Sequence, residues 1–248
     1  MAGSEEGQTE MKFYLGIHQA RWLAESPVPT FLSANTLRER VRLPTARTDW
    51  ALDSGGFTEL SKHGEWVSTP EDYVELVQRC QSECGMLDFA AIQDWMCEPE
   101  MVTRTGLSVL VHQTLTIESY LELMELDSSI PWLPVLQGWT HGDYLDHLEA
   151  YAKAGVDLTK LERVGIGSVC RRQNTMRVGF IIRDLASMGL KLHAFGFKVT
   201  GLRDVAEFLT SADSMAWSFE ARKQKGDPNS LATALEWREK LPPAALAP

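Results

Sequence analysis

Short apolar runs rich in β-branched and aromatic residues recur along the chain, and longer segments with a helical period of apolar residues separate them. Eight of these runs predict strands: Phe13–Ile17, Thr30–Ser33, Trp50–Asp53, Phe89–Gln93, Trp132–Gln137, Arg163–Ser168, Lys191–Phe195 and Ser214–Ser218. Eight strands that alternate with helices in one domain favour a closed parallel barrel over an open doubly wound sheet. The predicted fold class is therefore α/β, a (β/α)8 TIM-type barrel in a single domain.

The segments between the predicted strands carry start and stop signals for helices. Thr69 can cap a helix over Pro70–Glu83, in which the proline takes the first helical position. Glycines end two further predicted helices, and a proline pair ends the last one. The other predicted helices are Asp143–Ala154, Gln173–Ser187, Leu202–Leu209 and Ser230–Lys240.

Composition and length agree with one globular domain. The chain has 248 residues, of which 44% are hydrophobic and 23% charged, and a single α/β barrel commonly takes about 250 residues. We expect residues 11–248 to form the barrel and residues 1–10, which are polar and acidic, to be a flexible tail. No apolar stretch approaches the roughly 20 residues that cross a bilayer, and no signal-peptide core opens the chain, so we expect a cytoplasmic protein without a membrane partner.

Net charge and cysteine content limit which nucleic acids, metals and cofactors the protein is expected to bind. A net charge of −10 excludes a non-specific nucleic-acid binder that works through a broad basic surface, although Arg171, Arg172 and Lys198 could contact phosphates locally. The four cysteines do not form a zinc-binding set with nearby histidines, and they suggest reduced thiols. We therefore expect no metal and no cofactor.

Polar residues gather where the predicted strands end. In an α/β barrel the active site lies at the carboxyl ends of the strands. Asp53, Asp94 and Gln137 end predicted strands, and Asp213 directly precedes the last one. A single aspartate at such a position is more often a helix cap, but three carboxylates and an amide at one barrel mouth predict an active site.

These residues stand in recognisable segments. Asp53-Ser54-Gly55-Gly56-Phe57 resembles the Asp-Ser-Gly-Gly-aromatic segment of the tRNA- and DNA-guanine transglycosylases, and four more segments follow in the order of that family. The four are Ile92-Gln93-Asp94-Trp95, Gln137-Gly138, Gly165-Ile166-Gly167 and the segment that contains Asp213. The resemblance implies an enzyme that replaces guanine in a polynucleotide by a 7-deazaguanine base.

The resemblance also implies roles for individual residues. Asp213 would be the nucleophile that attacks C1′ of the nucleotide, and Asp53 would handle protons. Asp94 would bind the guanine edge together with Gln137 and Gly138, Phe57 would stack on the base, and Gly165 and Gly167 would let the backbone approach it. From the residues themselves, we expect Phe195 to stack on a flat heterocycle and His193 to point into the barrel mouth.

The chemistry of base exchange calls for these residue types. Displacing a base from a sugar passes through an oxocarbenium-like state, which a carboxylate can stabilise or trap covalently. A second carboxylate can move protons on and off the purine. A third can accept hydrogen bonds from the N1–H and the amino group of guanine, so that adenine is rejected.

Two departures from the tRNA enzymes bear on the substrate. No cysteine follows Asp213, so the zinc subdomain of the bacterial tRNA enzymes is missing, and Ser214-Met215-Ala216 replaces their Pro-Thr-Arg continuation. The chain thus most resembles the zinc-free phage-type (DpdA-like) branch, which inserts 7-cyano-7-deazaguanine or a relative into DNA. The expected partners are DNA rather than tRNA and a 7-deazaguanine base, in a possible homo- or hetero-oligomer.

Three alternatives stay open. A transglycosylase acting on tRNA or on a free nucleoside would suit the acidic net charge. A non-catalytic subunit of a heteromeric transglycosylase could keep the base pocket, although it would need neither Asp53 nor Asp213. An unrelated barrel lyase or aldolase is disfavoured because no lysine ends an early or middle strand to form a Schiff base.

Overall fold

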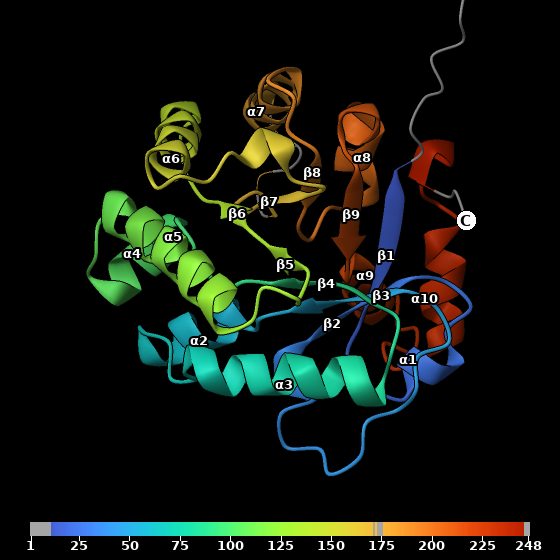
Figure 1. Cartoon of the computed structure of the whole chain (residues 1–248). Helices are drawn as coiled ribbons and strands as arrows, with labels where there is room; N and C mark the ends of the chain where they lie inside the picture. The colour runs from blue at the N-terminus through green and yellow to red at the C-terminus, as the bar shows by residue number, and fades with distance from the viewer. Residues whose placement is uncertain (1–10, 171, 173–175, 246–248) are drawn as a thin grey trace, which may run out of the picture.

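The computed structural model describes residues 11–170, 172 and 176–245. Its strands lie in one parallel sheet with the order β5-β4-β3-β2-β1-β9-β8-β7-β6. The two outermost strands in this order, β5 and β6, are consecutive in the chain and only Pro134 separates them. The sheet therefore returns on itself, and the two segments act as one strand of a closed barrel (Figure 1).

The strands in the described part of the chain match an eight-stranded barrel when β5 and β6 count as one. Their bounds are β1 (Lys12–Ile17), β2 (Thr30–Ser33), β3 (Trp50–Asp53), β4 (Leu87–Ala91), β5 (Trp132–Leu133), β6 (Val135–Leu136), β7 (Val164–Ile166), β8 (Leu192–Ala194) and β9 (Ser211–Ser214). Pro134 has no backbone N–H to donate, and it separates β5, which pairs with β4, from β6, which pairs with β7. The predicted TIM-type barrel is confirmed.

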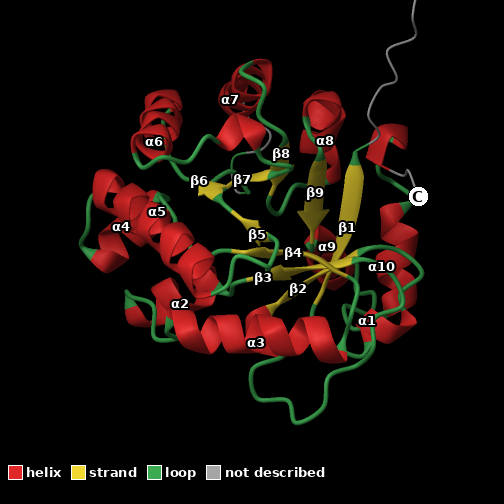
Figure 2. Ribbon diagram, in the orientation of Figure 1, coloured by secondary structure: helices red, strands yellow, loops and turns green. Residues whose placement is uncertain are grey.

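Helices surround the barrel on the outside (Figure 2). They are α1 (Trp22–Glu25), α2 (Gly56–His63), α3 (Pro70–Glu83), α4 (Pro99–Thr105), α5 (Val109–Leu126), α6 (His141–Lys153), α7 (Met176–Ser187), α8 (Val199–Val205), α9 (Ala216–Lys223) and α10 (Leu231–Arg238). Thr69 caps α3 as predicted, and Thr140 forms a reciprocal capping box with Asp143 at the start of α6. None of the described helices is long and apolar enough to cross a membrane.

Apolar side chains form two layers of core. The larger layer fills the space between the strands and the helices, and it includes Phe13 and Leu15 of β1. The smaller layer fills the barrel itself with Tyr14, Phe31, Ala51, Phe89 and Leu133. Successive residues of a strand point to opposite faces, so strands buried on both faces are apolar throughout. This explains why the strands were visible as continuous apolar runs.

The last predicted strand is wrong in position. We expected it at Ser214–Ser218, but β9 covers Ser211–Ser214 and α9 begins at Ala216. A short apolar run can belong to a buried strand or to a helix, and the Ala-Trp-Ser-Phe run starts a helix here. As a result, Asp213 lies near the carboxyl end of a strand instead of before one.

Other boundaries shift without changing the architecture. Strand β4 begins two residues before the predicted Phe89. Helix α8 begins at Val199, three residues before the predicted start, and a 3-10 turn continues it to Phe208. The described part of the predicted helix Gln173–Ser187 is α7, and residues 173–175 lie outside the described residues, as does the expected tail of residues 1–10.

A charged network lies at the amino-terminal end of the barrel. Lys12 Nζ donates to Asp49 and to Asp88, both at 2.7 Å, and the Tyr14 hydroxyl donates to Asp88 as well. Arg163 Nη1 lies 3.5 Å from the same Asp88 carboxylate. Asp88, which lies on β4, therefore links two residues of β1 with the residue that precedes β7.

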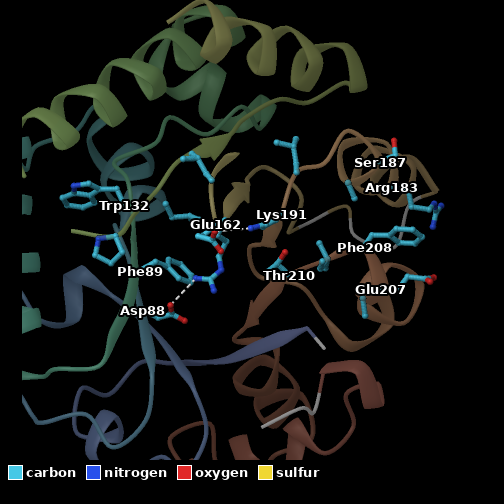
Figure 3. Close-up of a pocket in the computed structure, with 18 of the residues that line it drawn as sticks. Asp88, Phe89, Trp132, Glu162, Arg183, Ser187, Lys191, Glu207, Phe208 and Thr210 are labelled. Atoms are coloured by element: carbon cyan, nitrogen blue, oxygen red, sulfur yellow. Dashed lines mark hydrogen bonds and ion pairs between the residues drawn. The ribbon is translucent and has the colours of Figure 1, made fainter. Parts of the chain in front are cut away.

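A cavity of about 1340 Å³ opens beside this network (Figure 3). Its walls include Asp88, Phe89 and Trp132 on one side and Lys191 and Phe208 on the other. None of the residues predicted to take part in base exchange lines it. In barrel enzymes the amino-terminal face contributes stability and the opposite face carries the chemistry, so we assign this end to folding.

Replacing Asp88 tests that assignment. Burial alone would raise the pKa of Asp88, but hydrogen bonds from Lys12 and Tyr14 and the charge of Arg163 lower it below its ordinary value. A carboxyl group with a lowered pKa stabilises the fold above its unfolded-state pKa, and this contribution is lost as the pH falls through the folded value. We expect Asp88→Asn to lower the stability at about pH 7 by roughly 1–2 kcal/mol, or several degrees of melting temperature.

The measurement is thermal unfolding followed by circular dichroism at about pH 7 and about pH 3. The difference between Asp88→Asn and the unmodified protein should shrink at the lower pH. Asp49→Asn is the matched control, because the Asp49 side chain is 50% exposed and forms one of the two Lys12 ion pairs. An equal loss in both variants would contradict a special role for Asp88.

Candidate functional site

The predicted site residues meet at the carboxyl end of the barrel. Asp53 is the last residue of β3, and Asp213 is the third of the four residues of β9. Asp94, Gln137 and Phe195 follow β4, β6 and β8 within a few residues. Because the strands are parallel in a closed sheet, these positions share one mouth.

Asp94 and Gln137 form a direct pair across the mouth. Gln137 Nε2 donates a hydrogen bond to Asp94 Oδ2. The backbone of Gln137 is held as well, since its carbonyl accepts from Gln113 Nε2 at 2.8 Å and its N–H donates to His147 Nδ1 at 2.9 Å. Gln137 is fully buried, so its amide nitrogen is fixed toward the carboxylate.

Ser168 fixes the other end of the Gln137 amide. Its Oγ lies 2.7 Å from Gln137 Oε1, 2.8 Å from Glu98 Oε2 and 2.9 Å from the donating N–H of Cys97. Ser168 has a φ of 54°, which is rare for a residue other than glycine. Strain of this kind persists where surrounding contacts hold the residue in place, and here they join the loops after β4, β6 and β7.

Sequence reasoning missed the residues behind this pair. Glu98, Gln113, His147 and Ser168 are buried polar residues that position Gln137 directly or through Ser168. Ser168 follows the quoted glycine segment directly, so its place in the chain was a usable signal. Gln113 and His147 lie on α5 and α6, and no local pattern distinguishes them from exposed polar residues.

Burial, together with neighbouring carboxylates, raises the pKa values of two site residues. Burial raises the pKa of Asp53 to about 6, and the charge of Asp213 adds to the rise, while hydrogen bonds from Ser33 and from the Gly55 N–H oppose it. Burial likewise raises the pKa of Asp94 to about 7, with a further rise from the charge of Asp53. The charge of Asp53 thus acts on Asp94, and that of Asp213 acts on Asp53.

Among the residues that the structure describes, Asp213 is held through its Oδ1 atom. Its Oδ1 accepts from the Gly196 N–H at 2.9 Å and lies 3.5 Å from His193 Nε2. His193 Nδ1 lies 2.9 Å from Ser211 Oγ, so the imidazole sits between a hydroxyl and the carboxylate. The tautomer with a proton on Nε2 avoids placing a lone pair against Asp213.

His193 lies inside the barrel beneath the mouth. Its side chain is fully buried, and its ring contacts Phe89 and Phe195 at centroid distances of 5.0 and 4.8 Å. Burial lowers its pKa, although the neighbouring Asp213 opposes the shift. Contact of His193 with a substrate stays a prediction, whereas its contact with Asp213 is direct.

Two glycines make room for site side chains. A side chain at Gly167 would overlap the amide of Gln137, and a Cβ at Gly165 would lie 2.5 Å from the ring of Phe195. The glycine segment therefore lets Gln137 and Phe195 lie against β7. Gly55, with a φ of 86°, turns the chain after Asp53 so that its N–H returns to that carboxylate at 3.2 Å.

The remaining predicted residues lie around this centre or outside it. Phe57 stands at the start of α2 with 48% of its surface exposed, whereas Ser54 is buried. The Arg172 guanidinium lies 3.9 Å from the centre of the Trp139 ring, and Lys198 precedes α8. Arg171 lies outside the described residues. Among the described residues, no group of three or more His, Cys, Asp or Glu side chains could hold a metal ion.

These groups can bind a flat, polar heterocycle and exchange protons with it. Asp94 and Gln137 present a carboxylate and an amide side by side. Phe195 offers an aromatic surface at the same mouth. Asp53, with a pKa of about 6, can both release and take up a proton near neutrality.

The buried carboxyl group of Asp94 costs the folded state stability when it ionises. The raised pKa of Asp94 means that the folded state loses stability as the pH rises from the ordinary pKa toward about 7. Asparagine does not titrate and can still accept the Gln137 hydrogen bond. We expect Asp94→Asn to melt several degrees above the unmodified protein at about pH 8, with the difference shrinking at about pH 5, because one pKa unit is worth about 1.4 kcal/mol.

Thermal unfolding at the two pH values measures this difference. Asp146→Asn on α6 is the control, since that side chain is exposed and should leave the melting temperature unchanged at both. A variant at Asp94 that is less stable than the unmodified protein at about pH 8 would show that the carboxylate supports the fold.

Comparison with known proteins agrees with the geometry. No curated protein matches the sequence. A family model described as DpdA, DeoxyPurine in DNA protein A, matches residues 9–246, which is nearly the whole chain and includes every strand of the barrel. The DpdA-like resemblance of the sequence segments is thereby confirmed. The chain belongs to the DpdA family.

Proposed function

We propose that this protein is a guanine transglycosylase that exchanges guanine in DNA for a 7-deazaguanine base through a covalent link between Asp213 and the nucleotide. The observation that carries the proposal is the cluster of three carboxylates at one barrel mouth, in which two have pKa values near neutrality and the third is anchored by one oxygen. The family description, which refers to deoxypurine in DNA, supports DNA as the substrate.

Asp213 Oδ2 is the attacking atom in this proposal. Oδ1 is occupied by the Gly196 N–H and faces His193, so Oδ2 is left to approach C1′ of the target nucleotide. As the C1′–N9 bond breaks, its electrons leave with guanine, and Asp53 supplies the proton that neutralises the departing base. A carboxylate–sugar ester then holds the DNA strand on the enzyme.

The second half of the exchange reverses these steps. An incoming 7-deazaguanine loses its N9 proton to Asp53, and its N9 attacks C1′ while the bond to Asp213 Oδ2 breaks. Asp53 thus ends with the proton that it gave away, and the enzyme returns to its starting state. A pKa of about 6 suits a group that must act in both directions near neutrality.

Asp94 and Gln137 select the base. An ionised Asp94 can accept hydrogen bonds from N1–H and the 2-amino group of guanine, while the second N–H of Gln137 Nε2 donates to O6. Adenine would leave these buried groups unpaired, and such mismatches are strongly disfavoured. A 7-deazaguanine has the same hydrogen-bonding edge as guanine, so one site can serve both the leaving and the incoming base.

A labelling experiment tests the reaction and its substrate together. We expect radiolabelled guanine to enter DNA, and not tRNA or free nucleosides, in the presence of the protein. Asp213→Ala should reduce the incorporation by a factor of at least about 1000, because the nucleophile is lost. A DNA–protein adduct that survives a denaturing gel should form with the unmodified protein and disappear in this variant.

Asp146→Ala on α6 is the control and should incorporate label at the normal rate, since that side chain is exposed on an outer helix. Label entering only tRNA or nucleosides would replace the DNA proposal by one of the alternative substrates. Incorporation that Asp213→Ala leaves unchanged would remove the proposed nucleophile. Failure of the isolated protein to incorporate label at all would favour a non-catalytic subunit.

The pH dependence of base binding tests the role of Asp94. The carboxyl group must be ionised to accept two N–H groups, so guanine should bind more tightly as the pH rises through about 7. The charge of Asp53 raises the pKa of Asp94, and Asp53→Asn should therefore shift the midpoint of this rise to lower pH. Titration calorimetry with guanine between about pH 5.5 and 8 measures both effects. An affinity that does not vary over this range would contradict the proposed contact.

A further inference from the structure

A second pocket lies on the same face of the barrel as the carboxylates, between the start of α6 and the first half of α7. It has a volume of about 260 Å³ and is lined by Trp139, Thr140, His141, Arg172, Arg177, Phe180 and Ile181. We call it the α6–α7 pocket. None of the carboxylates and base-edge residues assigned above lines it.

Its walls combine aromatic rings with arginines. Phe180 is 54% exposed although it is a large apolar side chain, and its ring meets the His141 ring edge to face at 5.0 Å. His141 is itself held by Asp184, at 2.7 Å from its Nε2. Exposed aromatic rings beside arginines are the combination that proteins use to bind single-stranded nucleic acids, by stacking on bases and attracting the phosphates.

The pocket is fixed relative to the base-exchange site. Arg172 donates to the carbonyls of Ser168 and Trp139, so it ties together the loops that follow β7 and β6. Trp139 stands two residues after Gln137, a separation of at most about 7 Å along the chain. Successive nucleotides of one DNA strand rise by about 3.4 Å in a duplex. The α6–α7 pocket is therefore placed for a neighbour of the target nucleotide.

We propose that the α6–α7 pocket receives the base of a nucleotide one or two positions from the exchanged guanine and thereby sets the sequence context of the exchange. The inference rests on the proposed function, because it takes a DNA strand as the occupant. The size suits one planar base, since pockets for drug-sized ligands begin at about 300 Å³. Arg172 and Arg177 supply local positive charge on a chain whose net charge is −10.

An abasic scan of DNA binding tests the pocket without using catalysis. Single-stranded oligonucleotides carry one guanine, and each neighbouring base is removed in turn while the sugar-phosphate backbone is kept. We expect the unmodified protein to lose affinity at least about five-fold at one position within two nucleotides of the guanine, as loss of a stacked base predicts. Fluorescence anisotropy of the labelled oligonucleotides gives the dissociation constants.

Phe180→Ala should show the same loss on intact DNA and no additional loss when that one base is missing. Such non-additivity identifies two groups that contact each other. Phe180→Trp should keep the affinity, because it retains a stacking ring. Arg177→Gln should weaken binding to all the oligonucleotides alike, since a phosphate contact does not depend on the base.

Matched controls come from the same helix and its end. Arg183 lines the cavity at the opposite end of the barrel, and Met188, just after α7, is an exposed apolar side chain with 41% of its surface accessible. Arg183→Gln and Met188→Ala should bind every oligonucleotide as the unmodified protein does. Melting temperatures of all the variants show that the fold is intact.

Two results would overturn the inference. Phe180→Ala could bind intact DNA as tightly as the unmodified protein, or Phe180→Ala and the unmodified protein could lose affinity equally at every abasic position. Neither depends on base exchange. Should the scan behave as expected while labelled guanine fails to enter DNA, the pocket stands as a DNA-binding site and the proposed reaction falls. Should the exchange occur with an unaltered scan, the reaction stands and the pocket has no part in it.

Discussion

Closure of the sheet decides which parts of this chain can meet. The strand order begins with β5 and ends with β6, two segments that only Pro134 separates, so the strand they form pairs with β4 on one side and with β7 on the other. Every strand is parallel to its neighbours, and all the carboxyl ends therefore face one opening. Residues as distant in sequence as Asp53 and Asp213 share that opening for this reason alone.

The carboxyl-end opening brings three carboxylates together where they are largely buried from solvent. Burial makes Asp53 and Asp94 difficult to ionise, and the charge of Asp213 on Asp53 and of Asp53 on Asp94 adds to this difficulty. The surrounding donors are distributed so that each carboxylate keeps a partner: Gly55 for Asp53, Gln137 for Asp94 and Gly196 for Asp213. A site of this kind trades stability for groups that change protonation near neutrality.

The two ends of the barrel use charge in opposite ways. At the amino-terminal end, Asp88 is surrounded by Lys12, Tyr14 and Arg163, and these partners lower its pKa. At the carboxyl end, burial and the charges of neighbouring carboxylates raise the pKa values of Asp53 and Asp94. The larger cavity opens at the end where charges are paired, so cavity size alone would have led away from the candidate site.

The sequence by itself determined the barrel, and it predicted which residues form the candidate site at its carboxyl end. Buried parallel strands are apolar on both faces, and this pattern is local. Seven of the eight predicted strands therefore coincide largely with observed ones, the eighth shares only Ser214 with β9, and every predicted helix overlaps an observed one. The glycine and aspartate segments were equally local signals.

Only the tertiary structure decided the rest. The position of β9 was ambiguous, because the apolar run that begins α9 resembles a strand. The supports of Gln137 come from α5, α6 and two loops, and the pKa values of Asp53 and Asp94 depend on burial and on charges brought close by folding. Distances between residues far apart in the chain are set by sheet closure, which no local pattern contains.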